Sequence, residues 1–179
     1  MRRGLSFALL GIAGALAAGL GVLVSRGSEP WGIDDVWSAL FGKPDLGPVD
    51  FATLVRRSSP NNALACPPGI CPKARADLES PVLAVEGDRL RRIVAETALS
   101  EPGTEILYQG RWEDQDRYLV RSRLMRFPDT VSTLVVGMGE GRSSVAIYSR
   151  SQIGYSDLGV NRARVERWLT RIREAAARN

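Results

Sequence analysis

The chain has 179 residues, of which 44% are apolar and 25% are charged, and this fits one globular domain with an appendage. Its 24 basic and 20 acidic residues are interspersed and leave a net charge of +4, which excludes the coherent basic stripe of a nucleic-acid-binding protein. The lack of histidine excludes Ser-His-Asp and Cys-His nucleophilic systems, so general acid or base work would fall to carboxylates, Tyr or Cys.

The basic residues are unusual in kind rather than in number. All of them except Lys43 and Lys73 are arginine. Because arginine forms bidentate contacts with phosphate and carboxylate groups, this bias favours lipid headgroups or acidic partners. A coding preference for arginine on a solvated surface is the alternative interpretation.

Residues 1–25 have the pattern of a membrane anchor. Arg2 and Arg3 precede residues 5–24, a run of twenty residues without a charge. At about 1.5 Å per residue, a helix of this length crosses a hydrocarbon core of about 30 Å. We expect an uncleaved single-pass helix, because the run is longer than the apolar region of a secretory signal and lacks an Ala-x-Ala cleavage site at its end. Cleavage is the alternative, because the glycine and alanine content lowers the hydrophobicity of the run. The paired arginines predict a cytoplasmic N-terminus and a domain on the outer side of the membrane.

Residues 26–49 follow as a juxtamembrane segment. Six apolar residues fall mostly on one helical face, which predicts a short helix at the level of the lipid headgroups: Trp31, Ile33, Val36, Trp37, Leu40 and Phe41. Packing of these side chains onto the domain is the alternative. Residues 43–49, with two prolines and a glycine, predict a linker.

Cys66 and Cys71 lie in a segment rich in turn formers, with four residues between them. In an oxidising compartment, two such cysteines most simply form a disulfide that staples the loop. A thioredoxin-like pair would have two intervening residues, and a zinc site needs four ligands, which a chain without histidine supplies poorly. Two free, buried thiols are the alternative, because Pro67 and Pro68 restrict how the loop brings the sulfurs together.

Residues 50–179 predict one soluble α+β domain. Asp88 is the expected cap of a helix that ends at residues 101–103. Four strand candidates follow, at residues 105–112, 117–127, 130–137 and 143–149. Their short connections require antiparallel neighbours, so they predict a four-stranded meander. Two helices covering one face of this sheet make the fold class a two-layer sandwich.

The last strand candidate, the loop after it and the C-terminal helix form the most informative corner. Apolar side chains on both faces of residues 143–149 predict a strand that is central or covered on both sides. Residues 150–159 indicate a turn. Asn161, or alternatively Asp157, should cap a helix with apolar residues on one face and arginines on the other: Val165, Trp168, Leu169, Ile172 and Ala176 against Arg164, Arg167, Arg171 and Arg178.

This corner carries the candidate ligand-binding residues. They combine basic, hydroxyl, carboxylate and amide groups in one short segment: Arg150, Ser151, Tyr155, Ser156, Asp157, Asn161 and Arg162. The structural alternative assigns the same residues to helix caps, turns and an ion pair between Arg150 and Asp157. A secondary basic surface is expected from Arg121, Arg123 and Arg126 at the end of the strand predicted at residues 117–127.

Three ordered motifs of the chain resemble one known family. They are AIYSRSQIGYSDLGVNRARVERWL at residues 146–169, Phe127-Pro128-Asp129, and NALACPPGIC at residues 62–71. Together they are similar to the family catalogued as domain of unknown function 1499 (DUF1499), over about residues 46–175. The resemblance implies a shared fold and a set of characteristic residues, and it implies no reaction.

These features predict a protein of the bacterial inner membrane whose domain faces the periplasm and binds or scaffolds without catalysis. The expected partners are membrane lipids, through the N-terminal helix, and an anionic ligand or envelope protein; we expect no catalytic residue, cofactor, metal or nucleic acid. One alternative is a small envelope enzyme that uses Asp157 with Ser151 or Tyr155. The other is an assembly factor for a membrane complex.

Overall fold

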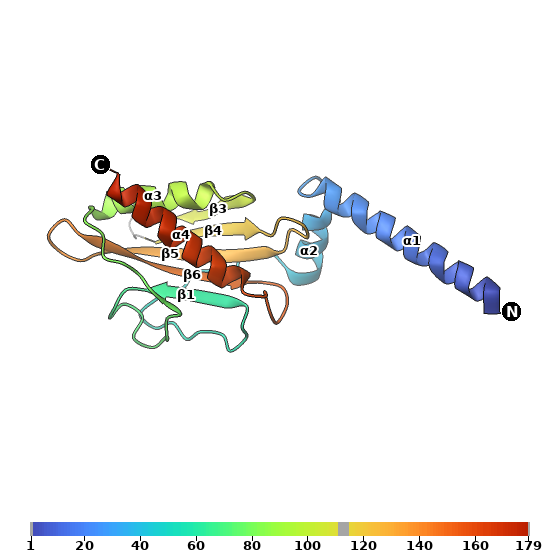
Figure 1. Cartoon of the computed structure of the whole chain (residues 1–179), viewed down its shortest axis with the longest axis horizontal. Helices are drawn as coiled ribbons and strands as arrows, with labels where there is room; N and C mark the ends of the chain where they lie inside the picture. The colour runs from blue at the N-terminus through green and yellow to red at the C-terminus, as the bar shows by residue number, and fades with distance from the viewer. Residues whose placement is uncertain (1, 111–114, 179) are drawn as a thin grey trace. The chain divides into compact units, whose positions relative to one another are not determined.

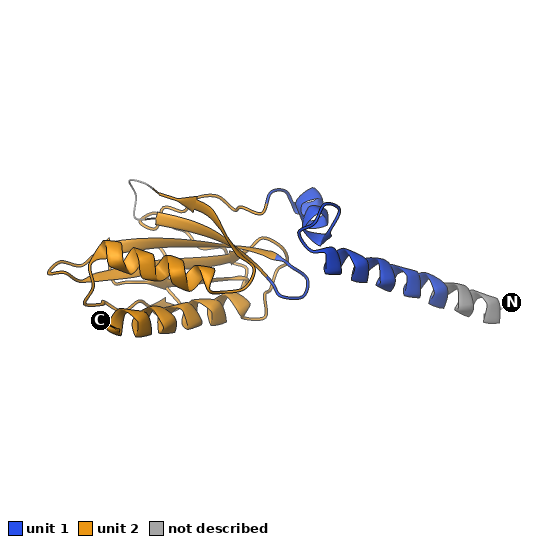
Figure 2. Cartoon of the chain, turned by 90° about the horizontal axis from the view of Figure 1, so that it is seen from above, with its two compact units in different colours: residues 1–43, 122–127 blue, residues 44–121, 128–179 orange. Residues whose placement is uncertain are grey.

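The computed structural model describes residues 2–110 and 115–178 of the chain. It divides into two compact units, one formed by residues 1–43 and 122–127 and the other by residues 44–121 and 128–179 (Figure 2).

The first unit begins with a long helix, α1 (Arg2–Arg26), which contains the uncharged residues 5–24 (Figure 1). Helix α2 (Ile33–Phe41) follows after a turn in which Gly27 and Trp31 have positive φ. Within the described part of the chain, no helix combines the length and the apolar character that crossing a membrane requires.

Helix α2 confirms the short helix predicted after the first apolar run. The Trp37 ring lies 5.1 Å from the Phe127 ring, and its Nε1 donates to the Met125 carbonyl oxygen at 2.7 Å. Trp31 and Leu40, in contrast, are 80% and 66% exposed. The apolar residues of this segment therefore have two kinds of surroundings: Trp37 packs within its own unit, whereas Trp31 and Leu40 face solvent.

The strand predicted at residues 117–127 is wrong in its second half. Strand β4 (Gln115–Arg121) ends at Arg121, and residues 122–127 form a turn closed by two backbone hydrogen bonds between Ser122 and its partners Arg126 and Phe127. Arg126 takes a positive φ of 52° and binds both carboxylate oxygens of Asp34 at 2.8 Å. This turn belongs to the first unit because α2 supplies its partners.

The second unit is built on a six-stranded mixed sheet with the strand order β2-β1-β6-β5-β4-β3 (Figure 1). Besides β4, its strands are β1 (Asn62–Cys66), β2 (Leu78–Glu79), β3 (Thr104–Gln109), β5 (Pro128–Gly137) and β6 (Ser143–Ser151). Strands β3 to β6 are antiparallel neighbours in sequence order, so the predicted meander is confirmed. Residues 111–114, which comprise the end of the strand predicted at residues 105–112 and the start of the connection after it, lie outside the described residues.

The predicted number of strands is wrong, because two strands precede the meander. Strand β1 pairs antiparallel with β6, with Asn62 opposite Arg150, and β2 pairs parallel with β1. The five residues of β1 are too few to show strand periodicity, and turn formers follow them directly. All five are buried, and β6 lies between β1 and β5. The central position predicted for residues 143–149 is therefore confirmed.

Two helices cover one face of the sheet, as predicted: α3 (Gly87–Leu99) and α4 (Val160–Ala177) (Figure 1). In the main core between these layers, Trp168 and Tyr118 are fully buried, with their rings edge-on at 6.0 Å. The predicted cap Asp88 is wrong, because α3 begins at Gly87 and Glu86 occupies the cap position. Asp88 instead lies in the first turn, where negative charge favours the helix.

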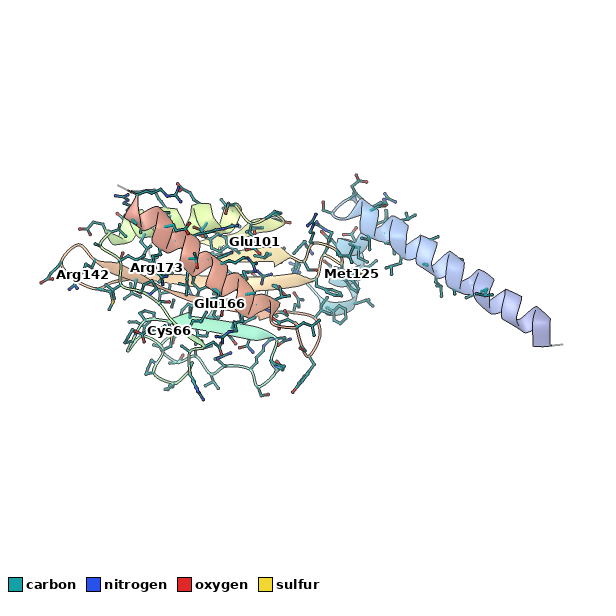
Figure 3. All side chains as sticks on the ribbon, in the orientation of Figure 1. Cys66, Glu101, Met125, Arg142, Glu166 and Arg173 are labelled. Carbon is teal, nitrogen blue, oxygen red and sulfur yellow. A yellow bond between two sulfur atoms is a disulfide. The ribbon has the colours of Figure 1, made fainter. Side chains whose placement is uncertain are left out.

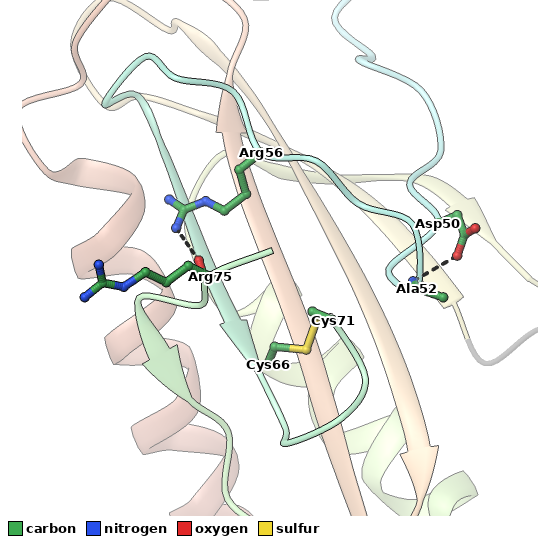
Figure 4. Close-up of a disulfide and its surroundings, with 6 residues drawn as sticks. All are labelled: Asp50, Ala52, Arg56, Cys66, Cys71 and Arg75. Atoms are coloured by element: carbon green, nitrogen blue, oxygen red, sulfur yellow. Dashed lines mark hydrogen bonds between the residues drawn. A yellow bond between two sulfur atoms is a disulfide. The ribbon is translucent and has the colours of Figure 1, made fainter. Parts of the chain in front are cut away.

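The opposite face of the sheet is covered by the segment before β1 and the loop after it. Phe51, Cys66 and Cys71 are buried there in a second apolar cluster. The two cysteines are bonded, with Cα atoms 6.3 Å apart (Figure 4), so the predicted disulfide is confirmed and the free-thiol alternative is wrong. Arg56 Nη1 donates to the Arg75 carbonyl oxygen at 2.8 Å and ties the two segments together (Figure 4).

Candidate functional site

Three of the seven candidate residues face inward between α4 and the sheet: Ser151, Asp157 and Asn161. Asn161 is fully buried, and its Nδ2 donates to Ser151 Oγ at 2.8 Å and to Asp157 Oδ2 at 2.6 Å. Its Oδ1 accepts hydrogen bonds from Ser149 Oγ and from Arg164 Nη1. Asn161 therefore ties the first turn of α4 to β6.

Arg164 extends this group into a buried ion network. Its guanidinium donates to Asp129 Oδ2 at 2.8 Å, to Ser149 Oγ at 2.9 Å and to Glu101 Oε1 at 3.3 Å. Glu101, labelled in Figure 3, also accepts from Trp168 Nε1 at 2.6 Å. Burial raises the pKa of Asp129 above its ordinary value, and the charge of Arg164 opposes this rise. We call the connected residues the buried network: Glu101, Asp129, Ser149, Ser151, Asp157, Asn161, Arg164 and Trp168.

The alternative prediction that Asp157 occupies the cap position is wrong, because that position is Gly159, but the Asp157 carboxylate still holds the start of α4. Its Oδ1 accepts from the Gly159 N–H at 2.9 Å and its Oδ2 from the Asn161 N–H at 2.8 Å. The prediction that Asn161 caps the helix is wrong: α4 begins at Val160, and the Asn161 amide faces the sheet, where the buried network offers it partners. Leu158 and Gly159 have φ values of 54° and 82°, so the hydrogen bonds of Asp157 hold a left-handed turn in place.

Replacing Asp157 by Asn should leave the domain folded but lower its free energy of unfolding by about 1 kcal/mol. Asparagine offers one acceptor oxygen instead of two, so one of the two backbone N–H groups at the start of α4 loses its partner. Denaturant unfolding of the full chain measures this loss. Ser156→Ala is the control, because exposed Ser156 makes only a 3.3 Å contact to the Leu158 N–H. Equal stability of Asp157→Asn and the unchanged protein would contradict the role of Asp157 in holding the start of α4.

Tyr155, Ser156 and Arg162 lie on the surface and do not join the buried network. Tyr155 is 75% exposed, and its neighbour Leu158 is 95% exposed. Arg162 pairs with Glu166 at 3.0 Å, one helical turn away, and an exposed pair of this kind contributes only about 0.3–0.5 kcal/mol. The loop after β6 therefore presents apolar side chains to the outside on a backbone that is fixed from within.

Arg150 lies on the opposite face of the sheet from Ser149 and Ser151, because successive residues of a strand point to opposite faces. Its guanidinium carbon lies 5.2 Å from the centre of the Tyr148 ring. The ion pair between Arg150 and Asp157, expected in the structural alternative, does not form between these two described residues. The candidate corner therefore contains two separate polar sites, one on each face of β6.

The three arginines of the expected secondary basic surface have different surroundings. Arg121, the last residue of β4, is buried and lies 3.8 Å from Glu105. Arg126 binds Asp34 in the first unit, and Arg123 is exposed in the turn at residues 122–127. Because β4 ends at Arg121, strand alternation does not place these side chains on one face.

The residue at the centre of the buried network, Arg164, was expected on the exposed arginine face of the C-terminal helix. It is only 2% exposed. One signal in the sequence indicates this position, because Asn161, Arg164 and Trp168 recur at three- and four-residue intervals and so share a helical face. Its acidic partners Asp129 and Glu101 lie 35 and 63 residues away, and no local pattern connects them to it.

The buried network suits a structural role better than a catalytic one. Ser149, Asn161 and Arg164 are at most 2% exposed, so no substrate can reach their polar atoms. Among the residues with described placement, no group of three or more His, Cys, Asp and Glu side chains could hold a metal ion. What the arrangement achieves is to fix α4 and the loop before it against the sheet.

Comparison with known proteins identifies a family. A family model described as "Protein of unknown function (DUF1499)" matches residues 67–172, more than half of the chain. The matched residues run from the disulfide loop to α4 and include the motif at residues 146–169. No curated protein and no solved structure matches the chain significantly.

Proposed function

The chain belongs to the DUF1499 family, and we propose that it is a membrane-tethered module that faces the periplasm and binds a lipid, an anionic ligand or an envelope protein without catalysing a reaction. The proposal has three parts: a tether, a compartment and a binding role.

The tether rests on the N-terminal sequence alone, because no helix of the described residues combines the length and the apolar character for crossing a membrane. Residues 5–24 carry no charge, and Arg2 and Arg3 precede them. A helix of this length reaches across a bilayer core of about 30 Å, and positive residues before it favour a cytoplasmic N-terminus. In this arrangement, the domain after the helix lies on the outer side.

The compartment is supported by the disulfide between Cys66 and Cys71, which is the observation that carries the proposal. Disulfides form and persist in oxidising compartments such as the periplasm and are rare in a reducing cytosol. Both cysteines are buried in the second apolar cluster, so the bond is part of the packed structure.

The binding role is supported by how polar and apolar groups are distributed. The buried network is closed to substrates, whereas Tyr155 and Leu158 stand exposed on the loop that this network fixes. An exposed apolar side chain on a rigid loop can contact a lipid interface or a protein without a large loss of conformational entropy. This distribution favours a binding role over a catalytic one.

A topology experiment tests the tether and the compartment together. We expect a reporter that is active only outside the cytoplasm, fused after Asn179, to be active, and the fusion to sediment with membranes. Deleting residues 2–26 should remove both properties, because the deletion removes the whole of α1. If this reporter is inactive on the full chain, and a second reporter that works only in the cytosol is active there, the proposed location is overturned.

Purification of the full chain from solubilised membranes tests the binding role. Analysis of the bound lipids and proteins should find a component that co-purifies with the unchanged protein and is present in a smaller amount with Leu158→Ser. Leu99→Ser is the matched control, because Leu99 is also exposed (50%) but lies at the end of α3. A protein that carries neither lipid nor partner would contradict the binding role.

A further inference from the structure

Among the described residues, Arg150 is a buried cation without an acidic partner. The residue is only 8% exposed, and no carboxylate of the described residues lies within 4.0 Å of its guanidinium. It keeps one hydrogen bond, from Nη2 to the Gly47 carbonyl oxygen at 2.9 Å, and it lies over the ring of Tyr148. Buried charges are normally paired, so this guanidinium lacks the partner that usually compensates its loss of solvent.

The carboxylate whose charge acts on Arg150, that of Asp45, is already engaged by another arginine. Arg117 binds both carboxylate oxygens of Asp45, at 2.8 and 2.9 Å, and Asp45 also accepts the Gly47 N–H at 2.8 Å. Burial alone would raise the pKa of Asp45, but the hydrogen bonds from Arg117 and Gly47 hold it below its ordinary value. Asp45 is thus an ionised carboxylate whose acceptors are used by Arg117 and Gly47.

Positive charge accumulates around Arg150. Burial lowers its pKa, and the charges of Arg57 and Arg117 lower it further, with Tyr148 and Asp45 acting in the opposite direction. Arg57 reaches the same place from the segment before β1, since its Nη1 donates to the Ser151 carbonyl oxygen at 3.4 Å. The guanidinium groups of Arg57, Arg117 and Arg150 and the carboxylate of Asp45 together carry a net charge of +2.

One donor of Arg150 also lacks a partner. Its Nε is buried and makes no hydrogen bond to any described residue. An unsatisfied buried donor costs free energy, and an anion bound at the edge of the guanidinium compensates its buried charge without reaching Nε itself.

We propose that Arg150, together with Arg57 and Arg117, binds a phosphate group. A phosphate monoester carries about −1.5 to −2 charges at neutral pH and offers three acceptor oxygens, which fits a group of three guanidiniums and one carboxylate with a net charge of +2. The phosphate belongs either to a lipid headgroup or to a free phosphate compound. This inference deepens the proposed function and rests on it for the choice of an anionic ligand.

Thermal unfolding of the full chain in inorganic phosphate tests the site. We expect phosphate to raise the melting temperature relative to chloride at equal ionic strength, because a ligand that binds only the folded state stabilises it. Arg150→Met should weaken the apparent affinity for phosphate by about tenfold or more, which is the loss expected for one charge-assisted hydrogen bond. In chloride alone, this variant should unfold at the same temperature or higher, because it removes an unpaired buried charge.

Two further variants make the result decisive. Arg57→Met changes an exposed side chain, so it should weaken phosphate binding without endangering the fold. Arg162→Met is the matched control, because Arg162 is an exposed arginine of α4 that pairs with Glu166 and should keep the full response. The site is overturned if phosphate has no more effect than chloride on the unchanged protein, or if Arg150→Met and Arg57→Met respond as the unchanged protein does.

Vesicles separate the two sources of phosphate. If a headgroup is the ligand, the unchanged protein should bind phosphatidylcholine vesicles more tightly when they contain phosphatidic acid, whose headgroup is a phosphate monoester, and Arg150→Met should lose this difference. If free phosphate is the ligand, the melting temperature rises and the vesicle difference is absent. The two proposals fail separately. If the fusion experiment places the domain in the cytosol but phosphate still raises the melting temperature, the proposed location is overturned and the phosphate site stands.

Discussion

Replacing Arg164 by Met should lower the free energy of unfolding by about 3–5 kcal/mol at neutral pH, which is the loss expected when a buried ion pair is broken on one side. Arg164 is the only residue for which the described structure gives contacts to both Asp129 and Glu101, at 2.8 and 3.3 Å. After the change, Asp129 is left as a carboxylate that is 4% exposed and has lost its counter-charge. Denaturant unfolding of the full chain measures the effect.

The same change should become less damaging at acidic pH. Burial already raises the pKa of Asp129, and without the charge of Arg164 this pKa should rise further. A carboxyl group whose pKa is higher in the folded than in the unfolded state binds protons more readily when folded, so stability increases as the pH falls through that pKa. Unfolding near pH 7 and near pH 5 should therefore show a smaller gap between the variant and the unchanged protein at the lower pH.

Two comparisons identify the cause of the loss. Arg162→Met, on the exposed surface of the same helix, should cost no more than about 0.5 kcal/mol. The double variant Arg164→Met with Asp129→Leu should be more stable than Arg164→Met alone, because it removes the orphaned carboxylate as well. Equal losses for Arg164→Met and Arg162→Met would show that the buried network does not stabilise the domain.

Breaking the disulfide between Cys66 and Cys71 should cost about 2 kcal/mol, the chain-entropy value for a loop of this short length. For a protein of this size, such a loss lowers the melting temperature by about 4–8 °C. The mechanism acts through the unfolded chain, which gains conformations once the loop is open. Thermal unfolding of the full chain with and without a reductant measures the shift.

The variant with both cysteines changed to alanine separates the bond from other effects of the reductant. It should unfold at a lower temperature than the oxidised protein and should not respond to reductant, because no bond remains to be reduced. A reductant that leaves the melting temperature of the unchanged protein where it was would contradict a stabilising disulfide. The result also bears on the compartment, since the bond needs oxidising surroundings to persist.

At the candidate corner, residue types alone predicted part of the site correctly. Ser151, Asp157 and Asn161 do come together, because the loop between them is short and its turn and cap residues have local partners. Arg150 does not join them, because strand alternation directs its side chain to the face opposite that of Ser151. The prediction of a single site overlooked that the first two residues of the segment belong to a strand with two faces.

Local patterns in the sequence were sufficient for the α+β class, the antiparallel meander, the two covering helices and the cysteine pairing, because periodicity and spacing are properties of neighbouring residues. Strand β1 and the partners of Arg164 and Arg150 were decided only by the tertiary structure. A five-residue strand is specified by the strand it pairs with, and the state of a buried charge depends on groups that the fold brings in from far along the chain. Arg164 meets a carboxylate 35 residues away, whereas Arg150 meets a carbonyl 103 residues away and no carboxylate among the described residues.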